Sequence, residues 1–182
     1  MDDLIEFLHK VGKLKKIKRT GWVLSKIPNP ESVAEHSFRT AVMAFVLADK
    51  FRVNKERLIK MALVHDLAES LVGDITPGEI SRAEKFRKEK KAMQQLSRLV
   101  ENGRELMGLW EDFEKGKSEE AKLVFQLDKL EMVIQALEYE GEHKKDLGMF
   151  WDFTKNRVKD KYLSALLERL SSKRRQKDLR KV

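Results

Sequence analysis

The sequence predicts an all-α fold, a single-domain helical bundle, from three observations. Its clear hydrophobic repeats have the three-to-four-residue spacing of amphipathic helices. Side chains that cap helix N-termini precede several of these repeats. No segment has the alternation of a strand or the turn of a hairpin, and no internal repeat is found. A chain of 182 residues, 41% of them hydrophobic, is long enough to build one core.

Two helices separated by a loop are predicted at the N-terminal end. Residues 19–31 contain a glycine and two prolines among polar side chains, so they predict a structured loop. Ser32 stands three residues before Glu35, which is the spacing of a capping box, and the second helix should begin there. The apolar stripes of the two helices are, in order, Leu4, Leu8 and Val11, and then Ala34, Phe38, Ala41, Phe45 and Ala48.

Asn54 is positioned to cap a third helix, which we expect to extend to about Leu71. Residues 73–78 form a loop by composition, and Ser81 then begins a highly charged helix that ends near residue 101. The remaining helices are expected over residues 104–114, from Ser118 to about Tyr139, and around the apolar stripe of Leu163, Leu166, Leu167 and Leu170.

The domain is expected to cover residues 1–172, followed by a basic C-terminal tail over residues 173–182. The chain has no cysteine, which excludes disulfides, thiolate zinc sites and cysteine nucleophiles. No apolar run approaches the ~18 residues of a membrane span. The N-terminus, Met1-Asp2-Asp3, lacks a signal-peptide pattern, so we expect a cytoplasmic protein without a membrane partner.

The net charge of +8 favours anionic partners, such as phosphorylated metabolites, nucleic acid or a membrane surface. No aromatic side chains interleave with the basic residues of the tail, which argues against nucleic acid as the partner. The sequence also lacks the glycine-rich phosphate loops of the Walker and dinucleotide types.

The third predicted helix carries ionisable side chains on its buried face. His65, Asp66 and Glu69 follow Ala62 at intervals that place all four residues on one face of a helix. Burial of a carboxylate without a partner is costly, because the charge loses its hydration. A bound metal cation would offset that cost directly.

Two other predicted helices add residues of the same kind. Asp128 lies in an apolar segment of the long helix, and His36 lies just inside the capping box. A helical bundle can direct such side chains at one metal ion. Alternatively, a lone histidine on an apolar face is a core residue, and a mid-helix aspartate pairs with a lysine or arginine. The residues alone leave both interpretations open.

The pairs Glu35-His36 and His65-Asp66, followed by Asp128, resemble the H…HD…D signature of the HD-domain metal phosphohydrolases. Within that family the chain is similar to the 5′-deoxynucleotidase branch over roughly residues 4–140. The runs that carry this resemblance are RTGW at 19–22, ESVAEH at 31–36, ALVHDLAE at 62–69, VGDI at 72–75 and QLDKLEM at 126–132.

The resemblance implies a mostly helical homodimer that hydrolyses deoxyribonucleoside 5′-monophosphates to nucleoside and phosphate. Two residues separate the arginine and tryptophan of the RTGW run, as in the eukaryotic-type relatives. The residues that the resemblance assigns are His36, His65, Asp66 and Asp128 to the metal, Glu69 and Asp74 to catalysis, Arg19 to the phosphate, Trp22 to packing on the nucleotide, and Asp74, Ile75, Thr76 and Pro77 to the nucleotide pocket.

These ligands favour one divalent transition metal as the cofactor. Two histidines and two aspartates form a mixed nitrogen and oxygen set, which suits Mn, Co, Zn, Fe or Ni better than Mg or Ca. The chain has only four histidines, whereas dinuclear HD sites of the phosphodiesterase type generally take further histidine ligands. We therefore expect a single metal ion.

Two alternatives remain for the function. Another HD phosphohydrolase, acting on nucleoside triphosphates, cyclic nucleotides or a different phosphomonoester, would have the same ligands. A non-catalytic protein that binds nucleic acid would keep the fold without turnover, although the presence of both Glu69 and Asp74 argues against it.

Overall fold

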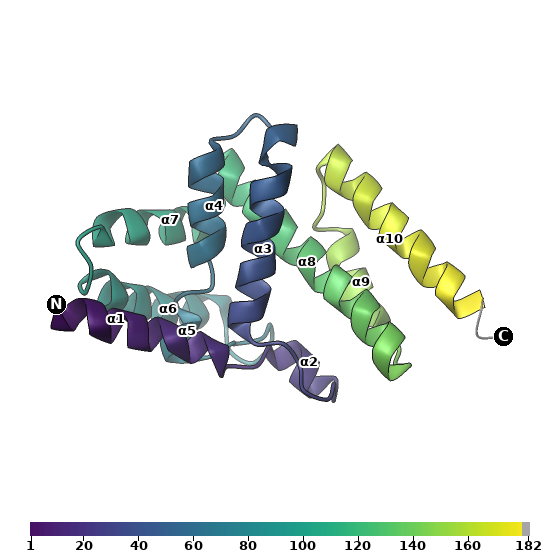
Figure 1. Cartoon of the computed structure of the whole chain (residues 1–182), viewed down its shortest axis with the longest axis horizontal. Helices are drawn as coiled ribbons and strands as arrows, with labels where there is room; N and C mark the ends of the chain where they lie inside the picture. Colours follow the sequence, from purple (N-terminus) through teal and green to yellow (C-terminus); the bar gives the residue numbers. More distant parts are fainter. Residues whose placement is uncertain (180–182) are drawn as a thin grey trace. The chain divides into compact units, whose positions relative to one another are not determined.

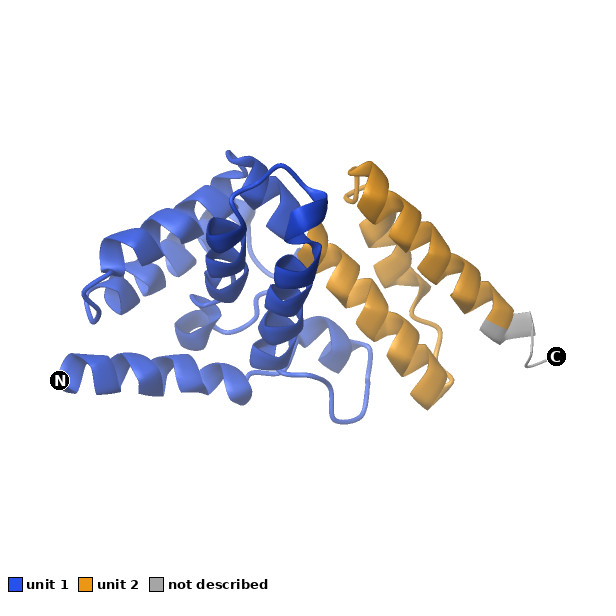
Figure 2. Ribbon diagram, turned by 45° about the horizontal axis from the view of Figure 1, so that its top comes forward, with its two compact units in different colours: residues 1–124 blue, residues 125–182 orange. Residues whose placement is uncertain are grey.

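The computed structural model describes residues 1–179, and every regular element in that part of the chain is a helix (Figure 1). The prediction of an all-α fold is therefore confirmed. The chain divides into two compact units, residues 1–124 and residues 125–182 (Figure 2). None of the described helices is both long enough and apolar enough to cross a membrane.

The first unit contains most of the helices, and α8 begins in this unit and continues into the second. Its elements are α1 (Asp2–Gly12), the 3₁₀ turn η1 (Lys13–Lys15), α2 (Thr20–Leu24), α3 (Val33–Leu47), the 3₁₀ turn η2 (Ala48–Lys50), α4 (Lys55–Val64), α5 (Glu69–Val72), α6 (Arg82–Ser97), α7 (Gly103–Lys115) and α8 (Glu119–His143).

The predicted helix starts are confirmed by their hydrogen bonds. Ser32 Oγ accepts from the Glu35 amide at 3.3 Å, while Glu35 Oε2 accepts from the Ser32 amide at 2.6 Å, so the capping box is complete. At α4, Asn54 Oδ1 accepts from the amide three residues later at 2.9 Å. Ser81 and Ser118 accept in the same way at the starts of α6 and α8. Local sequence therefore determines where these helices begin.

The core of the first unit packs around Trp110, which is fully buried and stacks on Phe86. Val33 of α3 and Leu67 and Ala68 of the α4–α5 connection are buried in the same cluster. These three residues lie within a few positions of the predicted metal ligands. Burial of a large apolar side chain contributes about 1.5–3 kcal/mol, so the core fixes the backbone from which those ligands project.

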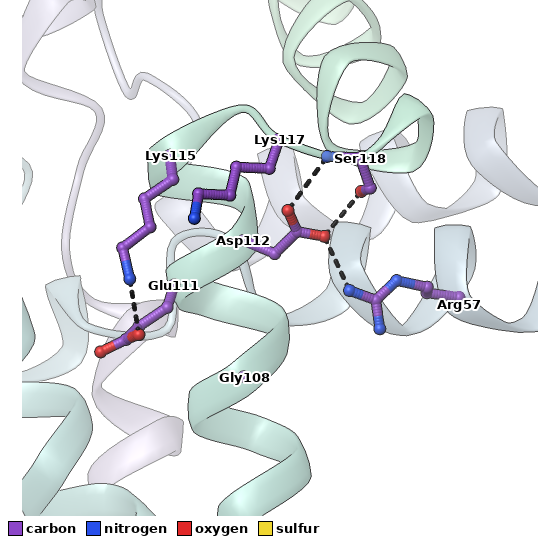
Figure 3. A pocket seen from close by; sticks show the side chains of 7 residues that line it. All are labelled: Arg57, Gly108, Glu111, Asp112, Lys115, Lys117 and Ser118. Atoms are coloured by element: carbon purple, nitrogen blue, oxygen red, sulfur yellow. Dashed lines mark hydrogen bonds and ion pairs between the residues drawn. The ribbon is translucent and has the colours of Figure 1, made fainter.

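An open hollow of about 500 Å³ lies on the first unit, at the junction of α4, α7 and the start of α8 (Figure 3). At its centre Asp112 Oδ2 accepts from Arg57 Nη2 at 2.7 Å and from Ser118 Oγ at 2.6 Å. Asp112 Oδ1 also accepts from the Ser118 amide. These bonds join the three helices, and none of the predicted site residues lines the hollow.

The second unit contains most of α8 together with α9 (Gly148–Lys155) and α10 (Lys161–Leu179). Gln126 Oε1 accepts from two backbone amides of the α9–α10 connection, at 2.7 and 2.8 Å. Arg174 Nη2 pairs with Glu140 at 2.9 Å and with Asp146 at 2.7 Å. The expected division at residue 172 therefore falls inside α10, and residues 180–182 of the predicted tail lie outside the described part of the chain.

Two predicted elements are corrected by the structure. Residues 19–31 are not a loop throughout, because α2 forms within them and buries Trp22. The third predicted helix does not run to Leu71, because α4 ends at Val64 and α5 begins at Glu69. Between them the backbone tightens, with amide-to-carbonyl bonds that span three residues, as in a 3₁₀ helix.

The predicted apolar stripe of α3 is also wrong in part. Phe38 and Phe45 are 69% and 55% exposed, whereas Ala41 and Ala44 are buried. α3 packs against α4 through these small side chains, and they allow a closer approach of the two helices than phenylalanine would.

We predict that Ser32→Ala destabilises the protein by about 1 kcal/mol, because the amide of Glu35 loses its cap in a segment where water has little access. Urea unfolding at equilibrium, followed by circular dichroism, measures this difference. Ser97→Ala is the matched control, since among the described residues its exposed hydroxyl donates to the Gln94 carbonyl and caps no helix N-terminus. An equal loss in both variants would contradict the capping argument.

Candidate metal centre

Three of the four predicted metal ligands meet in the first unit. Single ligand atoms of His36, His65 and Asp66 all lie within 4.8 Å of one another. Asp66 Oδ2 is 3.7 Å from His36 Nε2 and 3.2 Å from His65 Nε2, so the carboxylate oxygen faces both rings. His36 comes from the first turn of α3, and the other two residues from the end of α4. One cation could therefore bind all three side chains.

The ring of His65 is oriented by the backbone of its own helix. Nδ1 lies 2.8 Å from the carbonyl oxygen of Ala62, which can only accept a hydrogen bond. Nδ1 therefore carries the hydrogen, and in the neutral ring Nε2 keeps its lone pair. Phe113 packs edge-on against the same ring, with 5.3 Å between ring centroids. When His65 is neutral, Nε2 therefore faces the side of Asp66 with a free lone pair, which a cation bound by both residues would accept.

Buried polar atoms without hydrogen-bond partners indicate that these residues fit a metal ion. His65 Nε2, Asp66 Oδ2 and Glu69 Oε2 are buried and have no hydrogen-bond partner among the described residues. Buried polar atoms in this state are rare, because each loses its hydration without compensation. A divalent cation would satisfy the nitrogen and the oxygens at once.

Arg19 is the nearest cationic side chain to this cluster. Its Nη1 lies 3.6 Å from Asp66 Oδ2 and 3.7 Å from Asp74 Oδ1, so it stands between the two carboxylates. Burial alone would raise the pKa of Asp66, but in the metal-free protein the positive charges of a protonated His65 ring, of Arg19 and of His36 together hold it below its ordinary value. Asp66 is therefore ionised and able to bind a cation.

Glu69, the first residue of α5, is 3% exposed. Burial raises its pKa well above the ordinary value, and the negative charges of Asp66 and Asp74 act in the same direction. The predicted catalytic carboxylate is thus desolvated and next to the candidate ligands.

Asp74 is held in place by a residue that the sequence did not single out. Its carboxylate accepts from the Thr20 amide at 2.6 Å, and its carbonyl accepts from Thr20 Oγ1 at 2.6 Å. The rest of the predicted substrate loop follows directly: Ile75 is buried, while the amide of Thr76 donates to Glu79. Pro77 makes an isolated bridge with Ile80.

Trp22 lies in the protein core and not on a surface that is open to a ligand. It is only 1% exposed, and its Nε1 donates to Glu31 Oε1 at 2.9 Å. A carboxylate oxygen of Glu31 lies within 4.8 Å of a ring nitrogen of His36. Glu31 was not selected from the sequence, because nothing local distinguishes it from a solvated loop glutamate.

Asp128 belongs to the second unit and lies on α8. It is buried, and its Oδ2 accepts from Lys129 Nζ at 2.6 Å. Its assignment as the fourth ligand therefore remains a prediction from the sequence.

Two charged residues of α6 border the site. Lys85 Nζ lies 3.5 Å from Glu89 Oε1, and the Glu89 side chain is 5% exposed. Burial raises the pKa of Glu89 to about 7, and the charges of Glu114 and Asp66 add to this rise, while Lys85 opposes it. No spacing in the sequence connects these residues with the ligands, which lie elsewhere in the chain.

An all-helical scaffold with a buried His-His-Asp centre defines the class of protein. The HD-domain profile matches residues 11–170, and the chain belongs to this family. A single HD domain therefore spans most of the chain, and the family implies a divalent metal cofactor.

Within this family, the chain is similar to proteins named 5′-deoxynucleotidase. The chain is 46% identical to the 5′-deoxynucleotidase HDDC2 of Danio rerio, over 96% of this chain and 89% of that protein. It is also 46% identical to the 5′-deoxynucleotidase HDDC2 of Homo sapiens, over 94% of this chain and 86% of that protein. Similar proteins named 5′-deoxynucleotidase occur in yeasts.

The chain is also similar to proteins of known structure. The PH0347 protein of Pyrococcus horikoshii has a TM-score of 0.80 and 34% identity, over 91% of this chain and 97% of that one. A protein of Magnetospirillum magnetotacticum, described as a predicted metal-dependent phosphohydrolase, has a TM-score of 0.76 and 28% identity, over 96% of this chain and 92% of that one.

The raised pKa of Glu89 predicts a pH-dependent cost to stability. Unfolding returns this carboxyl to its ordinary pKa of 4.5, so the folded state holds the proton more tightly between about 4.5 and 7. Stability therefore falls as the pH rises through that window, by on the order of 2–3 kcal/mol. Glu89→Gln removes the titration and should stabilise the protein relative to wild type at pH 8, but little at pH 4.5.

Urea unfolding of metal-free protein across this pH range measures the difference. Glu84→Gln, at a half-exposed position on the same helix, gives the baseline for loss of one charge. Parallel stability curves for wild type and Glu89→Gln would contradict the prediction.

Proposed function

We propose that this chain is a metal-dependent 5′-deoxynucleotidase, which hydrolyses deoxyribonucleoside 5′-monophosphates to deoxyribonucleoside and phosphate. The observation that carries the proposal is the convergence of His36, His65 and Asp66 in a chain 46% identical to proteins of that name. Phosphomonoester hydrolysis is among the slowest reactions in water, so it needs the concentrated charge that such a centre holds.

His36, His65 and Asp66 would hold one divalent transition metal, with Asp128 as the fourth ligand. When bound, the ion would supply Lewis acidity toward a phosphoryl oxygen and toward water. The two imidazoles and two carboxylates favour Mn, Co, Zn, Fe or Ni, and fit Mg less well.

Glu69 and Asp74 act on protons and Arg19 acts on the phosphate. Glu69 is buried beside the ligands, where it can move a proton to or from the attacking water or the leaving alkoxide. Asp74 is fixed by Thr20 and orients the same water. Arg19, between Asp66 and Asp74, offers a planar fork of donors to the phosphate oxygens.

The loop that contains Asp74, Ile75, Thr76 and Pro77 lines the nucleotide. Pro77 stiffens this loop and the side chain of Ile75 offers no polar partner, so an added 2′-hydroxyl would be left without a hydrogen bond. Trp22 packs beneath the nucleotide as part of the wall rather than as an exposed ring, because it is buried. Discrimination against ribonucleotides follows from this lining.

The proposed enzyme is a cytoplasmic homodimer with small nucleotides as its partners. A two-fold pair is the commonest soluble assembly. Light scattering distinguishes the dimer from the 21.3 kDa monomer.

We predict phosphate release from dAMP, dGMP, dCMP and TMP, with AMP and GMP much slower. Strong chelation should abolish the activity, and Mn or Co should restore it, because the ligands cannot polarise phosphate by themselves. Phosphate release with and without added metal measures this. His65→Ala should lose both bound metal and activity.

Turnover in a verified metal-free preparation would overturn the metal mechanism. Equal kcat/KM for dAMP and AMP would remove the sugar preference and leave the metal site intact. Faster hydrolysis of nucleoside triphosphates or cyclic nucleotides would identify another HD phosphohydrolase.

Glu69→Gln and Asp74→Asn should each lower kcat by roughly 10²–10⁴-fold, the usual effect of losing a general acid or base. Bound metal, measured by elemental analysis, should remain near the wild-type value. Glu84→Gln is the control for a lost glutamate on the surface. Stoichiometric loss of metal in either variant would make that residue a ligand.

A further inference from the structure

The substrate loop between α5 and α6 is held from two sides. On one side Thr20 binds Asp74 through its amide and its hydroxyl. On the other, Lys85 Nζ donates to the carbonyl oxygen of Ile75 at 2.9 Å. Lys85 is the fourth residue of α6, ten positions along the chain from Ile75. Hydrogen bonds from α2 and from α6 therefore restrain two successive residues of the loop.

The ammonium group of Lys85 also lies in a strongly acidic setting. Glu89, one turn along α6, is 3.5 Å away. The negative charges of Glu89, Glu69, Asp66 and Asp74 all favour the charged form of Lys85, although burial opposes it. Lys85 and Arg19 both place a positive charge near Glu69, beside the candidate metal centre.

The two contacts of Lys85 have different consequences for the loop. The ion pair with Glu89 joins residues one turn apart on the same helix, so it restrains nothing outside α6. The bond to Ile75 joins the helix to the segment that would line the nucleotide. A charged donor to a backbone carbonyl makes a strong hydrogen bond, and this one is partly buried, with the Lys85 side chain 34% exposed.

We propose that Lys85 is a positioning residue for the proposed nucleotidase: it ties the Ile75 carbonyl to α6 and so keeps the substrate loop closed against the carboxylates of the metal centre. The inference rests on the proposed function for its effect on turnover. The restraint on the loop does not depend on which substrate is used.

The test compares Lys85→Met with Lys88→Met in the full chain. Lys88 lies on the same helix, is exposed, and pairs only with Glu84 in the contacts described. Hydrogen exchange of the amides at residues 74–76 and 78–80, measured on metal-free protein, reports loop restraint directly. We expect Lys85→Met to speed this exchange roughly 10- to 100-fold, the range for loss of a charge-assisted hydrogen bond. Lys88→Met should leave it unchanged.

Kinetics on metal-loaded protein with dAMP give a second measurement. KM should rise by a similar factor in Lys85→Met while kcat falls much less, because the released Ile75 segment binds the nucleotide whereas Thr20 still holds the catalytic Asp74. Lys85→Arg can still donate to the carbonyl and should recover most of both losses. A merely structural lysine would change the melting temperature without this separation of KM from kcat.

Glu89→Gln separates the two contacts of Lys85. It removes the ion pair and keeps the donor, so loop exchange should stay near wild type. Faster exchange in Glu89→Gln equal to that in Lys85→Met would overturn the proposal, as would wild-type exchange in Lys85→Met. If Lys85→Met does not fold, Lys85→Gln, which is too short to span the same distance, replaces it.

These readouts distinguish failure of this inference from failure of the proposed function. Suppose that Lys85→Met speeds loop exchange and that the wild-type protein hydrolyses no deoxynucleotide. The role of Lys85 in restraining the loop is then supported, and the proposed nucleotidase function is refuted. Normal loop exchange and KM in Lys85→Met, in a protein that hydrolyses dAMP, refute the tie alone.

Discussion

The burial of Asp66 and Glu69 in a helical core is the constraint on which the rest of the site depends. Asp66 finds two imidazoles and a guanidinium within 4 Å, and these keep it ionised. Glu69 has mainly like charges as close neighbours, and burial disfavours its charged form. Two carboxylates of the same core are therefore driven toward opposite protonation states, which is the separation that acid–base chemistry uses.

The supporting structure serves this arrangement at several levels. Capping at Ser32 fixes the start of α3, and thus the position of His36 along the helix. The carbonyl of Ala62 selects the tautomer of His65. Thr20 clamps Asp74 from a helix of only five residues. Short-range features thus orient individual groups, while the packing around Trp110 brings the separate segments together.

Sequence patterns were sufficient for the fold class and for the starts of α3, α4, α6 and α8, because these depend on local capping. The order of the ligand-type residues and the family resemblance together indicated that His36, His65 and Asp66 meet. Sequence patterns failed where tertiary contacts decide. On α3 both faces carry apolar side chains, so periodicity could not tell that Phe38 faces outward and Ala44 inward. The break after Val64 requires no proline or glycine, and therefore left no local signal.

The missed supporting residues have a common cause. Thr20 and Asp74 are separated by 54 positions, and Lys85 and Ile75 by ten. No spacing rule connects them, because their relation is created by the folded backbone. Glu31 was inconspicuous for the same reason: its partner Trp22 was expected to face the nucleotide rather than the core.

The tightened backbone between α4 and α5 restricts how this segment can change over evolutionary time. A residue added to or removed from positions 65–68 would rotate everything beyond it by ~120° in a 3₁₀ turn, or ~100° in an α-helix. Asp66 and Glu69 would then point in unrelated directions, and no side-chain substitution could restore them. Between Asp66 and Glu69, one apolar core residue can replace another, but the number of residues cannot change.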